Sequence, residues 1–280
     1  MAKVASALLA VAPYTCRMTS ELLETAPANI AHERRAWPMR LWLATPDWAF
    51  RVLGAAFFIT YVAYSAQKYW QNEFWKLGPF YDFADGTSIR MPWVPVLVDF
   101  TFVLIALGFC LRLRPVSRAA NGWVVAYSLF TAFGPLIPIW LSPLLGQWNE
   151  SWQAAYDKFL WRDSLTLTEV LAGGSLITLG ILIEIWGYVV LTRSFGIVPE
   201  ARKLKSSGPY RFVRHPVYLG QFIAQGGVWL FFAQLHVVWI AFYVVFVGLQ
   251  LYRSKLEDRV LADAFGDECR QWQERTFWFV

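Results

Sequence analysis

Long apolar runs separated by short polar segments dominate the chain from residue 48 onward. A helix needs about 20 mostly apolar residues to cross a bilayer, and four runs of that kind precede a longer one. This last run, His215–Tyr252, holds 38 residues without a charged side chain. A single helix of that length would measure about 57 Å, far more than the apolar thickness of a bilayer. We therefore expect it to fold back at Gln234–His236.

The pattern thus predicts an all-α integral membrane protein with six spans, the last two forming a helical hairpin. Pro135 and Pro138 should interrupt the third span, because proline removes a backbone donor and clashes with the preceding turn. The predicted spans are Trp48–Gln67, Pro92–Leu111, Gly122–Gly146, Val170–Leu191, Val217–Phe232 and Val237–Tyr252.

The same pattern divides the chain into three regions. Residues 1–47 form a polar leader that is flexible or lies on the membrane surface, residues 48–165 hold N-terminal membrane helices without a recognisable motif, and residues 166–280 form a C-terminal membrane core. The first residues, MAKVASALLAVAP, resemble a signal peptide. The predicted topology works without cleavage.

Composition agrees with a membrane protein. Hydrophobic residues make up 57% of the 280 residues and charged residues only 16%, against about a quarter in soluble domains. The mean hydropathy is +0.38. These values exclude a disordered chain and argue against a soluble enzyme. Three distant cysteines and three histidines favour neither a disulfide framework nor a metal site.

The distribution of basic residues predicts the orientation. Twenty of the 25 Lys and Arg residues lie on one side of the six-span topology, if Arg51 is counted with the N-terminal region. Because basic loops favour the cytoplasm, both termini are expected there. We attribute the net charge of +5 to loops that face an anionic membrane surface, and expect no nucleic-acid partner.

The segment Ser206–Phe222, SSGPYRFVRHPVYLGQF, is the first candidate for chemistry. Gly208-Pro209 indicates a turn, and Pro216 is suited to the first position of a helix. A helix N-terminus presents free N–H groups, and Arg214 and His215 make it attractive to a carboxylate or phosphate. The alternative is a basic loop with an ordinary helix cap.

A second candidate is RSKLEDRVLADAFGDECRQW, which follows the hairpin. Arg253 and Glu257 share a helix face and can pair. Because a hairpin returns the chain to the side that it left, Glu257 and Asp258 should lie near Arg214 and His215. The alternative is an amphipathic tail helix on the membrane surface.

Two acids fall inside predicted spans, Asp99 and Glu184. An ionisable side chain in a span is costly and is a functional hypothesis by default. Glu184 lies near the cytoplasmic end of its span, where it is a candidate for contact with substrate. The alternative for both is an interhelical hydrogen bond from a protonated acid.

GPYRFVRHPVYLG, followed some forty residues later by EDRVLADAFG, resembles the isoprenylcysteine carboxyl methyltransferase and phospholipid methyltransferase superfamily over about Gly180–Trp272. The resemblance implies S-adenosylmethionine as the cofactor, held at the cytoplasmic ends of the last helices, and implies that Arg253 meets a substrate carboxylate. Arg214 and Asp258 join the cofactor set because of their charge and position. The predicted cofactor-binding residues are Leu204, Tyr210, Arg214, His215, Pro216, Tyr218, Glu257 and Asp258.

The sequence departs from the family pattern at three places. Asp258 stands where the family has a second glutamate, and Cys269 and Trp272 stand where it has tyrosines. The first change is conservative. The other two leave the identity of the substrate open.

We therefore expect a membrane methyltransferase that acts on a lipid, a lipidated molecule or a small thiol, carboxyl or amine, with Arg253 and Glu184 as catalytic candidates and no metal. One alternative is an NADPH-dependent sterol or steroid reductase, because such enzymes share the RHPxYxG turn and have a tail similar to Asp267-Glu268-Cys269 and Trp272. The register of Glu257-Asp258 fits the methyltransferases better. The other alternative is a non-catalytic membrane scaffold. The oligomeric state stays open.

Overall fold

The computed structural model describes residues 45–71, 73, 78–83, 85–118 and 121–279. Residues Thr45–Val280 form one compact unit. The predicted leader therefore lies, apart from its last three residues, outside the described part of the chain. The division at residue 166 stays a prediction.

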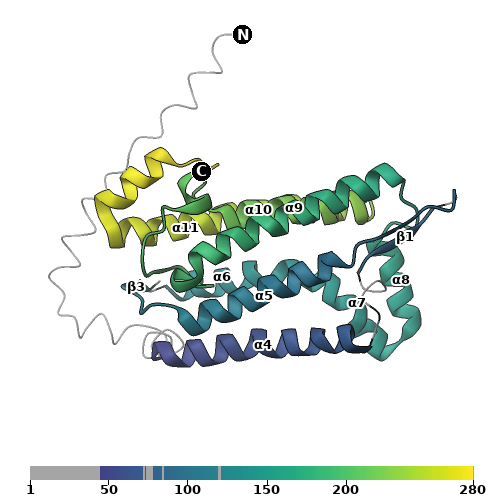
Figure 1. Cartoon of the computed structure of the whole chain (residues 1–280), viewed down its shortest axis with the longest axis horizontal. Helices are drawn as coiled ribbons and strands as arrows, with labels where there is room; N and C mark the ends of the chain where they lie inside the picture. Colours follow the sequence, from purple (N-terminus) through teal and green to yellow (C-terminus); the bar gives the residue numbers. More distant parts are fainter. Residues whose placement is uncertain (1–44, 72, 74–77, 84, 119–120, 280) are drawn as a thin grey trace, which may run out of the picture. The chain divides into compact units, whose positions relative to one another are not determined.

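Helices make up most of the described chain, and the strands are two or three residues long (Figure 1). The helices are α4 (Asp47–Gln71), α5 (Trp93–Leu111), α6 (Gly122–Phe133), η2 (Gly134–Leu136), α7 (Ile137–Trp148), α8 (Glu150–Leu160), α9 (Leu167–Leu191), η3 (Thr192–Ser194), η4 (Gly208–Arg211), α10 (Pro216–Gly227), the π-helix η5 (Val228–Phe232) and α11 (Val237–Arg275). The strands are β1 (Phe80–Asp82), β2 (Ser88–Arg90), β3 (Ser117–Arg118) and β4 (Glu200–Ala201).

The predicted fold class, an all-α integral membrane protein, is confirmed. Five segments of the described chain are long and apolar enough to cross a membrane: Asp47–Gln71, Trp93–Leu111, Gly122–Trp148, Leu167–Ser194 and Val237–Arg275. The remaining predicted span, the fifth along the chain, corresponds to α10 and η5, which together cover Pro216–Phe232. The count of six spans stays a prediction.

Prolines and polar residues break the helices where the sequence indicates. The 3-10 turn η2 separates α6 from α7 and contains Pro135, as expected for a residue that cannot donate to the helix ladder. The hairpin turns after η5, and the Nδ1 atom of His236 accepts a hydrogen bond from the backbone N–H of Val238 at 3.2 Å. His236 is therefore the N-cap of α11.

Glycines hold α9 and α10 close together. Gly173, Gly180 and Gly187 recur every seven residues, which places them on one face of α9. A methyl group at Gly180 would lie 2.5 Å from the backbone oxygen of Gly220 in α10, and one at Gly173 would lie 2.7 Å from the ring of Phe232. Small residues of this kind allow membrane helices to approach closely.

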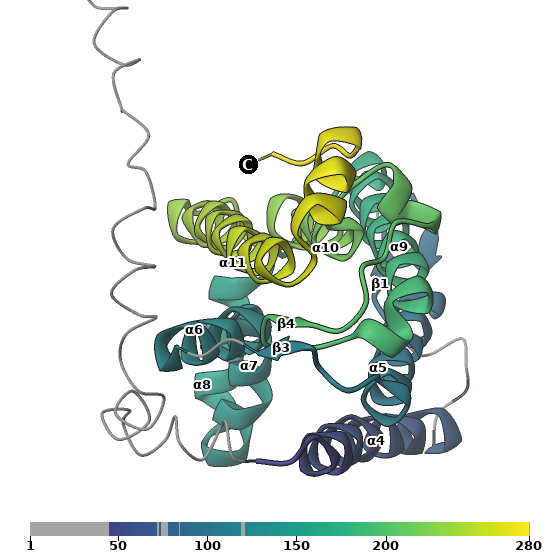
Figure 2. The same cartoon turned by 90° about the vertical axis from the view of Figure 1, so that its left-hand side faces the viewer.

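Short strands connect distant parts of the chain at one end of the helices. β3 pairs with β4 in antiparallel register, with Ser117 opposite Ala201 and Arg118 opposite Glu200. Figure 2 shows this pair between α5 and α6 and below α11 in this view. The basic segments 112–118 and 193–214 therefore meet at the same end, where α4 begins. The cytoplasmic orientation of this end stays a prediction.

Candidate active site

A cavity of about 800 Å³ lies among the helices, within the usual size range of small-molecule sites. Most of its wall is apolar and aromatic. One part is lined by Tyr81, Trp161 and Phe232, beside the start of α9. Polar side chains lie at the other part, where α9 ends and α10 begins. The cavity thus offers a mainly apolar chamber with a charged end.

The charged end is built by the turn that leads into α10. Gly208 has a φ of +59°, a backbone conformation that residues other than glycine rarely adopt. A methyl group there would also lie 2.8 Å from Val190. The turn continues through η4, and Pro216 then begins α10, where its lack of an N–H costs no hydrogen bond. Arg214 and His215 are thereby held at the helix N-terminus.

The acid pair of α11 meets this turn, as the sequence analysis predicts. The Nη1 atom of Arg214 lies 3.1 Å from Oδ2 of Asp258, and Nε2 of His215 lies 2.9 Å from Oδ1 of the same carboxylate. Both oxygens of Asp258 are therefore engaged by the turn. This carboxylate fixes the start of α10 to α11.

Glu257 has a different set of contacts. Its Oε1 atom accepts a hydrogen bond from the hydroxyl of Tyr218 and lies 3.5 Å from Nε of Arg253, so the predicted i, i+4 pair is present. Its Oε2 atom lies 3.7 Å from Nδ1 of His215, beyond hydrogen-bonding distance. One oxygen of Glu257 therefore keeps capacity to accept from a ligand.

Arg253 is held from several sides. Its Nη2 donates to the carbonyl oxygen of Ile197, and its guanidinium lies 5.4 Å from the centre of the Tyr218 ring. The residue is only 6% exposed. A buried guanidinium in this position is oriented before any ligand arrives.

Eight of the ten predicted site residues line the cavity: Glu184, Leu204, Tyr210, Arg214, His215, Tyr218, Arg253 and Glu257. Pro216 and Asp258 do not belong to its lining, and their contacts support the residues that do. Burial raises the pKa of Tyr210 well above its usual value, and the negative charges nearby raise this pKa further. Its hydroxyl therefore stays protonated at neutral pH.

The two acids inside spans have different surroundings. Asp99 accepts hydrogen bonds from Ser65, at 2.6 Å, and from Tyr69, and is absent from the cavity wall. It joins α4 to α5, so the bonds are interhelical, but Asp99 accepts them and is not the protonated donor that the alternative expected. Glu184 faces the cavity, and no side-chain hydrogen bond to it is found among the described residues.

Sequence reasoning missed a second group of polar residues in the cavity wall. Gln250 donates through Nε2 to Oε1 of Gln221 at 3.0 Å, while its own Oε1 is buried without a partner in the described structure. Gln225 accepts from the indole of Trp229 at 2.7 Å. The three glutamines stand inside the uncharged 38-residue run, so a search restricted to charged residues passes over them.

The aromatic residues near the C-terminus also contribute. Trp278 packs against His215 with ring centres 4.9 Å apart and donates to Oγ of Ser254 at 2.7 Å. The backbone of Phe277 accepts from Arg214 at 3.1 Å and donates to Phe212 at 2.9 Å. This segment covers the histidine.

The two departures in the tail lie beside the predicted site. Trp272 donates through its indole nitrogen to the carbonyl oxygen of Tyr210 at 2.9 Å, and Cys269 is fully buried in the same cluster. Both residues support η4 from outside the cavity wall.

Comparison with known proteins confirms the resemblance over the C-terminal part of the chain. Residues 168–268 match the phospholipid methyltransferase family. A stretch of 76 residues is 40% identical to methanethiol S-methyltransferase 1 of Bradyrhizobium diazoefficiens, a match that covers 24% of this chain and 22% of that protein. The match therefore spans about a fifth of the curated relative. Together with the apolar helices, the family match supports a multi-pass membrane protein.

Proposed function

We propose that the protein is an integral membrane methyltransferase that uses S-adenosylmethionine. The observation that carries this proposal is the group formed by His215, Tyr218, Arg253 and Glu257 at the charged end of the cavity. All four residues fall within the region that matches the phospholipid methyltransferase family.

The donors and acceptors at this end fit the cofactor. S-adenosylmethionine supplies a methyl group on a positively charged sulfur, and it also carries an amino group, a carboxylate and an adenosine. Oε2 of Glu257 is available to a cationic or N–H group. Arg214 and the N-terminus of α10 suit the carboxylate. Leu204 and Tyr210 offer apolar and aromatic surface.

The apolar part of the cavity suits a lipophilic or small acceptor. Aromatic and aliphatic side chains line it, so that water is excluded from the reacting groups and their electrostatic interactions are strengthened. The acceptor is a lipid, a lipidated molecule or a small thiol, carboxyl or amine. The name of the related methanethiol S-methyltransferase 1 supports the thiol class.

In this proposal, the alignment of the acceptor with the methyl group of the cofactor supplies most of the rate enhancement. Arg253 holds a negatively charged acceptor, such as a carboxylate or thiolate, beside the cofactor. Glu184 receives the proton from an acceptor that must lose one, such as an amine. Neither task requires a metal.

Ligand-induced stabilisation tests the proposal. The protein is purified in detergent, and its unfolding temperature is measured with S-adenosylhomocysteine and with NADPH. We expect a rise with S-adenosylhomocysteine only, because a ligand that binds the folded state alone stabilises it. A rise with NADPH alone would replace the proposal with the reductase, and no response to either would favour the scaffold.

A transfer assay then identifies the acceptor class. S-adenosylmethionine with a labelled methyl group is incubated with the protein and with methanethiol, a prenylated cysteine or membrane phospholipid. Label in a volatile thioether, an ester or an extractable lipid distinguishes the three acceptors. A protein that binds the cofactor but labels none of them would contradict this set of acceptors while leaving the cofactor proposal intact.

A further inference from the structure

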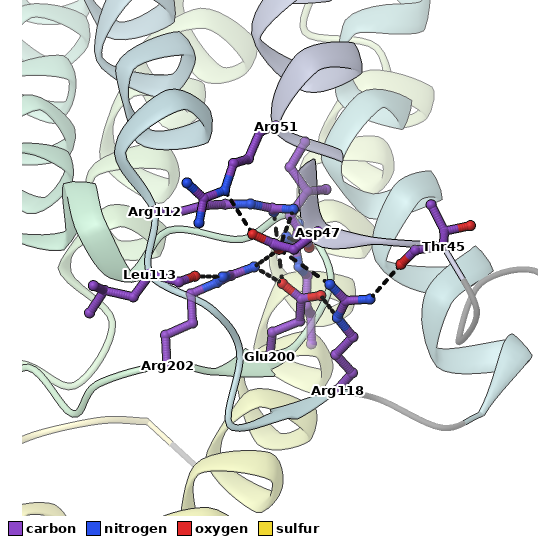
Figure 3. Close-up of polar contacts among 10 residues, drawn as sticks. Thr45, Asp47, Arg51, Arg112, Leu113, Arg118, Glu200 and Arg202 are labelled. Atoms are coloured by element: carbon purple, nitrogen blue, oxygen red, sulfur yellow. Dashed lines mark hydrogen bonds and ion pairs between the residues drawn. The ribbon is translucent and has the colours of Figure 1, made fainter. Parts of the chain in front are cut away.

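A second group of charged side chains lies where β3 and β4 meet the start of α4. Figure 3 shows Asp47 among the guanidinium groups of Arg51, Arg112, Arg118 and Arg202, with Glu200 beside them. We call these six residues the arginine cluster. They come from three separate segments of the chain: α4, the stretch from the end of α5 through β3, and β4 with the residue that follows it.

Two carboxylates share four guanidinium groups. Asp47 lies 2.8 Å from Arg51, 2.9 Å from Arg112 and 3.2 Å from both Arg118 and Arg202. Glu200 contacts Arg118 at 3.2 Å, Arg112 at 3.8 Å and Arg202 at 2.5 Å. The arginine cluster therefore carries two positive charges more than its own acids neutralise.

The excess charge lies largely out of solvent. The side chain of Arg202 is 0% exposed and that of Arg112 is 3% exposed. The Nε atoms of Arg112 and Arg202 are buried and have no hydrogen-bond partner in the described structure. Buried charges and donors without partners are costly. The pKa of Arg112 is lowered to about 10. The main cause is burial, and the second is the neighbouring positive charge of Arg202.

More cations continue from the arginine cluster into the cavity. Glu200, Arg202, Lys203 and Lys205 all line the cavity wall. No ion pair of Lys203 or Lys205 with an acid is found among the described residues. Burial lowers the pKa of Lys205, and the positive charges of Lys203 and Arg193 lower this pKa further. The excess positive charge therefore borders the cavity, which a ligand can enter.

We propose that the arginine cluster, with Lys203 and Lys205, binds the phosphate group of an anionic ligand. Guanidinium forks match phosphate oxygens, and basic pockets between membrane helices bind anionic lipid head groups. The two lysines form the accessible side of the site. The buried guanidinium groups behind them add a positive electrostatic potential that attracts the anion. The source of the phosphate is an anionic phospholipid or soluble phosphate.

The test compares lipids that differ in charge. The full-length protein is purified in detergent without S-adenosylmethionine and titrated with phosphatidylglycerol, phosphatidylcholine or inorganic phosphate. Native mass spectrometry measures bound lipid, and the unfolding temperature measures all three ligands. We expect phosphatidylglycerol to bind more tightly than phosphatidylcholine and to raise the unfolding temperature. Stabilisation by inorganic phosphate without a preference for phosphatidylglycerol supports the site with soluble phosphate as its occupant.

A charge-matched pair of variants separates a site from general attraction. Lys203→Gln with Lys205→Gln leaves the arginine cluster intact, so the fold is preserved. Each lysine near an anionic head group contributes about fivefold to binding, and the double variant should bind phosphatidylglycerol about 25-fold more weakly. Lys255→Gln with Arg270→Gln removes the same charge from exposed positions of α11 and should bind as the wild type does.

Two results would overturn the proposal. One is equal binding of phosphatidylglycerol and phosphatidylcholine together with no response to inorganic phosphate. The other is the same loss of binding in both double variants. Because these measurements use no cofactor, either failure leaves the proposed methyltransferase function untouched.

Discussion

Gly180 of α9 lies directly against Gly220 of α10. A methyl group at Gly180 would come within 2.5 Å of the backbone oxygen of Gly220 and 2.4 Å of the backbone nitrogen of Ala224. Backbone atoms cannot rotate away as the end of a side chain can. This contact therefore sets the distance between α9, which carries Glu184, and α10, which carries Tyr218.

Gly180→Ala should destabilise the protein. The added methyl must push α10 away, and overpacking of this kind costs about 1–3 kcal/mol. The measurement is thermal unfolding in detergent, followed by loss of helical circular dichroism. Gly248→Ala is the matched control, because Gly248 is also helical and a methyl there meets nothing within 4 Å. Equal stability of the two variants would show that the contact does not set the helix spacing.

Glu257→Gln should weaken the binding of S-adenosylhomocysteine. The substitution keeps the shape and removes the charge next to Arg253 and His215. A charged hydrogen bond contributes about 1.5–3 kcal/mol, which predicts a loss of about 10- to 100-fold in affinity. Isothermal titration measures the affinity. Glu274→Gln, at an exposed position of the same helix, should bind as the wild type does; unchanged affinity in Glu257→Gln would refute the assignment of this carboxylate.

Asp258→Asn should act chiefly on stability. Asp258 lies outside the cavity wall, and both its oxygens hold the turn at Arg214 and His215. Loss of these charged contacts should cost about 1–3 kcal/mol of unfolding free energy. Denaturant or thermal unfolding detects the change. A variant with normal stability and abolished ligand binding would instead place Asp258 in direct contact with the cofactor.

Gly266→Ala should loosen the last part of α11. Gly266 has φ +52° and ψ −122°, where an alanine is strained by about 1–2 kcal/mol. The residues beyond it include Trp272, which supports Tyr210. We expect faster hydrogen exchange over residues 267–275 and weaker cofactor binding. Gly86→Ala introduces similar strain at φ +84° in the exposed turn between β1 and β2, and a comparable drop in cofactor binding there would contradict this explanation.

Asp47→Asn should be among the most damaging single substitutions at this end of the bundle. Removal of one carboxylate leaves only Glu200 to balance the buried guanidiniums of Arg112 and Arg202, which predicts a loss of about 3 kcal/mol. Asp267→Asn removes an exposed partner of Arg270, and surface pairs contribute little. Chemical unfolding of both variants checks the difference. Similar stabilities would mean that water or a bound ion replaces the Asp47 carboxylate.

Patterns repeated over many residues could be read from the sequence. The apolar runs placed α4, α5 and α9 to within a few residues and gave the start of α11, because the length of a span and the absence of charge are properties of a local window. The end of α11 was missed, because the helix continues past the predicted Tyr252 through charged residues to Arg275. The need for a hairpin followed from the length of the uncharged run, and its place followed from the polar break at Gln234–His236. The juxtaposition of Asp258 with His215 followed from the hairpin, since a chain that returns brings its two ends together.

Features that depend on side chains far apart in sequence could not be read in this way. Nothing near Asp47 indicates that it meets Arg202, 155 residues later. The glutamines of the cavity look like isolated polar residues until α10 and α11 pack. The helix α8 is amphipathic and short, and the polar content of residues 150–160 hides it from a search for spans.

The segment between α9 and η4 touches both charged regions of the cavity. Its Ile197 carbonyl binds Arg253, and its Glu200 side chain, three residues later, belongs to the arginine cluster. A ligand that shifts this segment at one region therefore alters the geometry offered at the other. Linkage requires such an influence to be reciprocal: whatever factor an anion applies to the affinity for the methyl donor, the methyl donor must apply to the affinity for the anion.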